Sequence, residues 1–179
     1  MLEIKTNDGV IVLKPLERRW LDTAVELYNC SGDIRYATGI TSPVSCLELS
    51  ENLDRLEASK NEFLAGIFIT ASNNISHECQ SQLAGVVSGI LHEKTLWIKL
   101  IAVLPKLRQM GIGTRTTRLL FQYSKVCYGT TEAFLSVIEK NDVGVRFWFS
   151  QGFSEAGRFI KVLFDGEQPY EVVIMHKRL

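Results

Sequence analysis

Two glycines one residue apart, set between an apolar strand and an amphipathic helix, place the strongest constraint on what this chain can fold into. They lie in VLPKLRQMGIGTR, residues 103–115. A β-type run precedes them at 96–104, helical spacing follows as far as Cys127, and another β-type run spans 132–138. A strand, a helix and a strand with short connections are typical of a βαβ unit. We therefore predict two parallel strands joined by a crossover helix.

The segments on either side predict a mixed α/β fold in one domain, residues 1–179, which is an ordinary length for a single domain. We expect further strands at 9–16, 62–70, 82–91, 157–164 and 170–177, and further helices at 17–30, from about Cys46 to Lys60, and from Asn141 to Gln151. Ser45 and Glu48 form a capping box ahead of the second helix. The nearly continuous apolar runs at 62–70, 82–91 and 96–104 predict strands covered on both faces.

Composition excludes several classes of protein. Twenty basic residues balance twenty acidic ones, so the chain offers no general attraction to nucleic acid. No apolar run is long enough to span a bilayer, and the polar start MLEIKTNDG is not that of a signal peptide. The four cysteines are scattered, which predicts reduced thiols, a cytoplasmic protein and no metal site. His77 and Cys79 lie in a polar stretch that predicts a loop.

The glycine pair indicates an anion site. A helix start exposes unpaired N–H groups, and glycine removes the Cβ atoms that would keep a phosphate away from them. Thr114 can add a hydroxyl, and five bases with no acid lie between Pro105 and Lys125. The P-loop lysine is missing, and Thr116 stands where the dinucleotide fingerprint has its third glycine. The pattern [RQ]-x-x-G-x-[GA] is complete, although a glycine-rich turn beside a solvated basic face remains an alternative.

Two spaced motifs carry a resemblance to a known family. IAVLPKLRQMGIG resembles motif A of the GNAT superfamily of N-acetyltransferases, and LSVIEKNDVGVRFWFSQGF resembles that family's second signature. In the second motif Gly144 stands for the small residue and Trp148 for the tyrosine. The resemblance covers roughly residues 10–179. It implies a mostly antiparallel central sheet, splayed between its fourth and fifth strands, with helices on both faces.

The resemblance also implies acetyl-CoA as cosubstrate, bound between the splayed strands. The backbone of 101–103 would bond the pantetheine arm, residues 108–114 the pyrophosphate, and Asn141 the pantetheine or its own helix as an N-cap. The cofactor residues implied are Ile101, Ala102, Val103, Arg108, Gln109, Met110, Gly111, Ile112, Gly113, Thr114, Asn141 and Trp148. Arg115 and Arg118 would lie near the adenosine phosphates or face solvent.

The implied reaction moves an acetyl group to a primary amine of a small molecule or peptide, by direct attack in a ternary complex. Ribosomal-protein alanine acetyltransferases carry a glutamate base and a tyrosine acid, where this chain has Ser136 and Trp148. Neither can replace the original group, so the catalytic residues are unknown; we expect Trp148 to pack beside the thioester or within the core. A non-catalytic acetyl-CoA sensor or interaction domain is the alternative that this loss favours.

The remaining expectations concern the acceptor and its surroundings. We expect the acceptor site to lie between the loop 31–44, which should be weakly ordered without ligand, and the turn 165–169. Asp33, Arg35 and Tyr36 in the first loop do not choose between acceptors. The nearest acidic or imidazole groups along the sequence, His92, Glu93 and Glu139, are expected on the surface. No nucleic-acid or membrane partner is expected, and a homodimer is possible.

Overall fold

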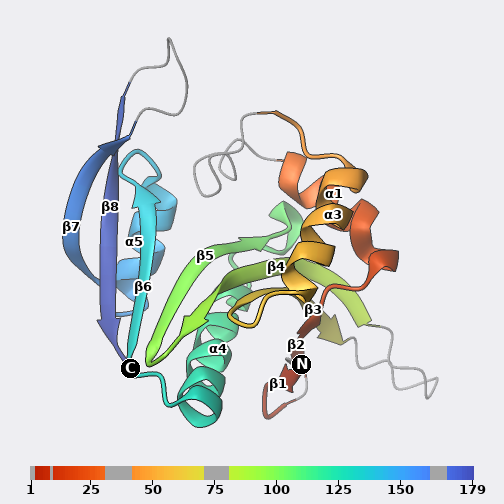
Figure 1. The fold of residues 1–179 in the computed structure, drawn as a ribbon, viewed down its shortest axis with the longest axis horizontal. Coiled ribbons are helices and arrows are strands. Elements are labelled where there is room, and N and C mark those ends of the chain that lie inside the picture. Colours follow the sequence, from red (N-terminus) through yellow and green to blue (C-terminus); the bar gives the residue numbers. More distant parts are fainter. Residues whose placement is uncertain (1–2, 9, 31–41, 71–80, 162–168) are drawn as a thin grey trace.

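The computed structural model describes residues 3–8, 10–30, 42–70, 81–161 and 169–179. Its architecture is an eight-stranded sheet in the order β1-β2-β3-β4-β5-β6-β8-β7 (Figure 1). The elements, in chain order, are β1 (Ile4–Lys5), β2 (Ile11–Pro15), η1 (Arg18–Trp20), α1 (Leu21–Asn29), α3 (Cys46–Glu57), β3 (Glu62–Thr70), β4 (Ser81–His92), β5 (Thr95–Val103), η2 (Pro105–Leu107), α4 (Ile112–Tyr128), β6 (Glu132–Ile138), α5 (Asp142–Ser150), β7 (Ser154–Lys161) and β8 (Tyr170–Arg178).

The predicted mixed α/β fold is confirmed. β5 and β6 are parallel with α4 as their crossover, and the other strand pairs are antiparallel. Every predicted helix and strand is present, whereas β1 was missed because two residues are too short for a periodic signal. β7 begins at Ser154, three residues earlier than expected, because its first residues are exposed and carry no alternation. Its predicted end at 164 lies outside the described residues.

Helices cover both faces of the sheet (Figure 1). α1 and α3 pack on one face through a core that includes Leu27, Leu53 and Phe68. α4 and α5 pack on the other through a core that includes Leu120 and Trp148. Five consecutive residues are buried in each of the central strands, 64–68 in β3 and 83–87 in β4, so the prediction of strands covered on both faces is confirmed for these two. In β5 only alternate residues are buried and Lys99 is exposed, so the prediction is wrong for the third run, whose second half lies beyond the last pair with β6.

The sheet opens between β5 and β6. Their pairing runs only from Thr95–Glu132 to Ile98–Leu135, although β5 continues to Val103 and β6 to Ile138. This confirms the predicted splay between the fourth and fifth strands, which become β5 and β6 once β1 is counted. Beyond Ile98 the edge of β5 that faces β6 has no strand partner in the described pairing. Unpaired backbone groups in such a place need water or a ligand.

Candidate active site

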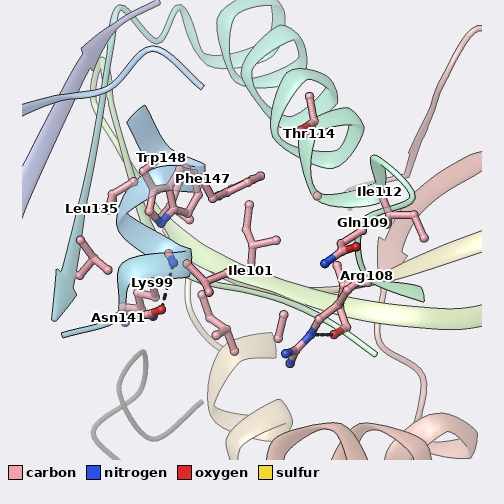
Figure 2. Close-up of a pocket in the computed structure, with 18 of the residues that line it drawn as sticks. Lys99, Ile101, Arg108, Gln109, Ile112, Thr114, Leu135, Asn141, Phe147 and Trp148 are labelled. Atoms are coloured by element: carbon pink, nitrogen blue, oxygen red, sulfur yellow. Dashed lines mark hydrogen bonds between the residues drawn. The ribbon is translucent and has the colours of Figure 1, made fainter. Parts of the chain in front are cut away.

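A cavity of about 530 Å³ lies where β5 and β6 separate, bounded by the start of α4 and by α5 (Figure 2). This volume is within the usual range of small-molecule sites. All but one of the residues that the family resemblance assigns to the cofactor line it: Ile101, Ala102, Val103, Arg108, Gln109, Gly111, Ile112, Gly113, Thr114, Asn141 and Trp148. The exception is Met110, whose side chain points into solvent with 65% of its surface exposed. The fold therefore brings the two sequence motifs to one cavity.

The turn at the start of α4 leaves its first N–H groups available. Gly111 is the N-cap at φ 74° and makes no side-chain cap, whereas Ser45 caps α3 and Asn141 caps α5 through their side chains. Gln109 also has a left-handed backbone, at φ 63°, and nothing lies within 4 Å of the position of a Cβ on Gly111. These residues fit an anion such as a diphosphate, which the helix dipole would also favour.

Asn141 holds the start of α5. Its Oδ1 accepts a hydrogen bond from the N–H of Gly144 at 2.9 Å. A Cβ on Gly144 would lie 2.7 Å from the amide nitrogen of Asn141, which explains why a small residue stands at this point of the second motif. The N-cap role is therefore confirmed, and the same side chain lines the cavity.

Two side chains that sequence reasoning did not place together mark the point where the strands separate. Lys99 and Ser136 directly follow the last β5–β6 pair, and both line the cavity. The β4–β5 register shifts at Ser88/Gly89, so Lys99 is the extra residue of a bulge. A lone lysine within the apolar run LWIKLIAVL was the visible signal, but the register is set between strands and could not be read from it.

Lys99 is held by a carboxylate. Its Nζ lies 2.8 Å from Oε2 of Glu62, whose Oε1 lies 3.5 Å from Nη1 of Arg55 on α3. The hydrogen bond from Lys99 is the main cause that lowers the pKa of Glu62 below its usual value. Glu62 is therefore ionised at neutral pH and is a weak proton acceptor.

Trp148 lies both in the core and on the wall of the cavity. The residue is 9% exposed, and its ring packs edge-on against Phe147 and Phe153, with centroid separations of 4.8 and 5.3 Å. It belongs to the core cluster under α4 and α5, and it also lines the cavity opposite the start of α4 (Figure 2). An indole here contributes an apolar wall but no acidic proton.

Other charged residues singled out from the sequence lie elsewhere. Arg115 forms an ion pair with Asp8 beside the β1–β2 hairpin and is not among the residues that line the cavity. Glu139 is bonded to Arg158 on the surface. His92 and Glu93 lie at the β4–β5 turn, at the end of the hairpin far from the splay. The surface placement expected for His92, Glu93 and Glu139 is confirmed.

Several expectations fall outside the described residues. These are Asp33, Arg35 and Tyr36 with most of the loop 31–44, the turn 165–168, and His77 and Cys79. Within the described ranges, no group of three or more His, Cys, Asp or Glu side chains could hold a metal ion. No helix in those ranges is long and apolar enough to cross a membrane.

Solved structures share this fold over nearly the whole chain. Spermidine N-acetyltransferase from Vibrio cholerae, in complex with CoA and spermine, has a TM-score of 0.75 at 20% identity, over 94% of this chain and 95% of that one. The spermidine/spermine N-acetyltransferase SpeG of the same organism, with manganese ions, has a TM-score of 0.69 at 20% identity, over 96% and 94%. A dodecameric form has a TM-score of 0.70 at 20% identity, over 94% and 93%. The fold is that of the N-acetyltransferases.

The sequence itself identifies the family. The model of the acetyltransferase (GNAT) family matches residues 42–153, from α3 and its N-cap to the end of the second motif. No curated protein matches the sequence. The match covers well over half of the chain, so the chain belongs to the GNAT acetyltransferase family. It is an acetyl-CoA-dependent N-acetyltransferase, which moves an acetyl group from acetyl-CoA to an amine.

Proposed function

We propose that acetyl transfer to a primary amine takes place directly, in a ternary complex within the cavity between β5 and β6. The observation that carries this proposal is the continuity of the cavity, which joins the glycine turn to the point where the strands separate. A diphosphate at one end and a thioester at the other require such a connected space.

Backbone groups supply most of the cofactor site in this proposal. The N–H groups at 111–114 bind the diphosphate, and the open edge of β5 at 101–103 pairs with the pantetheine arm as a neighbouring strand would. A backbone N–H of this edge also polarises the thioester carbonyl, as an oxyanion donor does. Asn141 and Trp148 lie beside the pantetheine on the side of α5.

Direct attack by the amine is supported by where the thiols lie. The cysteines of the described residues, Cys30, Cys46 and Cys127, are exposed, and none of them lines the cavity. An acetyl-cysteine intermediate therefore has no candidate among them. Acetyl-CoA supplies the thioester, and the chain's contribution is to hold it and the amine together, an effect worth roughly 7–11 kcal/mol at the well-oriented limit.

The amine reaches the site in its neutral form. No carboxylate or imidazole is among the described residues that line the cavity, so the proton is lost to water before attack. The value of kcat/KM should then rise with pH up to the pKa of the acceptor itself, about 7.7–8.0 for an α-amine and about 10.4 for a lysine-type amine. A plateau at one pH for both acceptors would instead reveal a base on the enzyme.

The charge of the lining favours an acceptor with a single amine. Lys99 and Arg108 are the charged residues among the described lining, and both are cationic. The related enzyme from Vibrio cholerae is seen with spermine, a polyamine. Glu62 is shared between Lys99 and Arg55, so this group of three side chains keeps a net positive charge. A second positive charge close to the reacting amine would be repelled by it, so we propose a monoamine or a peptide N-terminus. The dodecameric relative supports self-association, and a homodimer stays a prediction.

Release of the CoA thiol tests the proposal. Purified protein is mixed with acetyl-CoA and, in separate reactions, with an alkyl monoamine, a peptide bearing a free N-terminus, and spermidine. We expect thiol release that depends on the acceptor, with an equal amount of acetylated amine detected by mass spectrometry. Acetyl-CoA binding without turnover of any primary amine would contradict the proposed reaction.

A further inference from the structure

A chain of hydrogen bonds connects the end of α5 to the start of α4 beside the cavity. Ser150 Oγ donates to the carbonyl of Phe147 at 2.6 Å. Nε2 of Gln151 donates to Ser150 Oγ at 3.0 Å and to Thr114 Oγ1 at 3.2 Å. Thr114 lines the cavity in the first turn of α4, across from Phe147 and Trp148 (Figure 2). Gln151 is therefore half-buried between the two helices that bound the site.

The direction of each bond in this chain is fixed by the chemistry of its members. A hydroxyl can donate one hydrogen bond, whereas the amide nitrogen of a glutamine side chain can donate two and accepts none. The only proton of the Ser150 hydroxyl is in its hydrogen bond to the carbonyl of Phe147, so Ser150 must accept the hydrogen bond from Gln151. A flipped Gln151 would place its carbonyl oxygen against the lone pairs of Ser150. The amide is thereby held with its second N–H toward Thr114, which must accept it.

Thr114 accepts the hydrogen bond from Gln151, so its own hydroxyl proton can be donated to another partner. Thr117, one turn later in α4, donates its hydroxyl to the carbonyl of Gly113 at 2.9 Å, the usual arrangement for a threonine within a helix. Among the hydrogen bonds of the described residues, Thr114 donates to no such carbonyl. A hydroxyl that accepts from a fixed amide, and has a free proton in a cavity, is oriented to donate to a ligand.

We propose that Gln151 is a positioning residue for the cofactor: it holds the Thr114 hydroxyl so that this donates to the diphosphate of CoA. The inference rests on the proposed function, since it needs the diphosphate beside Gly111 and Gly113. It adds a residue from the far end of α5 to the phosphate site, and it couples the spacing of α4 and α5 to cofactor affinity. Hydrogen bonds to charged groups are among the stronger ones, so the effect is measurable.

The test is a double-mutant cycle read by calorimetry with CoA. Thr114→Val should weaken CoA binding roughly tenfold or more, which matches a lost hydrogen bond to a charged group. Gln151→Met should weaken it by about three- to tenfold in the otherwise native protein and have no further effect when Thr114 is already Val. Gln151→Glu should be the most harmful, because a carboxylate would accept a hydrogen bond from the Thr114 hydroxyl and would repel the diphosphate.

Two controls separate this role from a merely structural one. Pantetheine, which lacks the diphosphate, should bind all variants equally, whereas an altered helix spacing would weaken it too. Ser150→Ala keeps Gln151 but frees its amide to flip, and should weaken CoA binding by about two- to threefold; this variant carries the test if Gln151→Met does not fold. Equal losses from Gln151→Met with Thr114 and with Val at 114 would overturn the inference. Failure of the native protein to bind CoA would overturn the proposed function, and the inference with it.

Discussion

The two ends of the cavity are built in different ways. At the end proposed to bind the diphosphate, called the phosphate end here, the backbone N–H groups of 111–114 belong to a glycine turn, and α4 lacks the side-chain cap that α3 and α5 possess. At the opposite end, proposed to hold the thioester and called the acyl end here, side chains dominate: Lys99 with its partner Glu62, Ser136, and the wall formed by Trp148. A backbone site tolerates little change in its few glycines, whereas a side-chain site can change its acceptor and keep its cofactor. Changes at the phosphate end should therefore be the more damaging.

The largest effect is expected from Gly111→Asp. The new carboxylate would stand where the diphosphate binds, and we expect CoA affinity to fall by more than about a hundredfold. A left-handed backbone also costs a non-glycine residue about 1–2 kcal/mol of stability. Gly129→Asp is the matched control, since Gly129 ends the same helix at φ 64° with nothing within 4 Å of its Cβ position.

Calorimetry on both variants, with thermal unfolding as the check on stability, decides the matter. Similar losses of stability with CoA binding lost only in Gly111→Asp would establish the phosphate role. Native affinity in a folded Gly111→Asp protein would show that the turn is structural and that the cofactor lies elsewhere.

A smaller, acceptor-dependent effect is expected from Lys99→Met. Removal of a cation from the acyl end should raise kcat/KM for a diamine by about three- to tenfold relative to a monoamine, consistent with screened repulsion between two charges. Lys106→Met is the control, because Lys106 is a cation of the same region that does not line the cavity. An unchanged ratio of the two acceptors would remove Lys99 from acceptor selection.

The glycine turn and the start of α4 could be predicted from sequence because their determinants are neighbours in the chain. Gly111, Gly113 and the start of α4 lie within a few residues, and their geometry follows from local backbone preferences. The acyl end could not be predicted in the same way. Lys99 faces the cavity because of a bulge set by β4, and it meets Glu62, 37 residues away along the chain. The N-cap of Asn141 was local and predicted, whereas its place on the same cavity wall as Lys99 depends on the whole sheet.

A modest effect is expected from Trp148→Phe. A phenyl ring keeps most of the contact with Phe147 and Phe153, so kcat with an active acceptor should fall by less than about tenfold. Loss of a general acid costs about 10²–10⁴. The measurement is kcat against pH for both proteins, with folding verified by circular dichroism. A fall beyond roughly a hundredfold in folded protein would require a chemical part for the indole.

The smallest effect is expected from Arg115→Ala. Arg115 lies in the first turn of α4, close in sequence to the phosphate turn, but its guanidinium is paired with Asp8 of the β1–β2 hairpin. We therefore expect CoA affinity to change by less than about threefold, with only a small loss of stability, because the pair is exposed to solvent. The companion variant Asp8→Ala sharpens the test, because it releases Arg115 without removing it. If Arg115 served the phosphates, that release would strengthen CoA binding at low salt, and Arg115→Ala would weaken it. Equal, near-native affinity in both variants, with similar small losses of stability, would confine Arg115 to holding the hairpin and leave the diphosphate to the backbone of the turn.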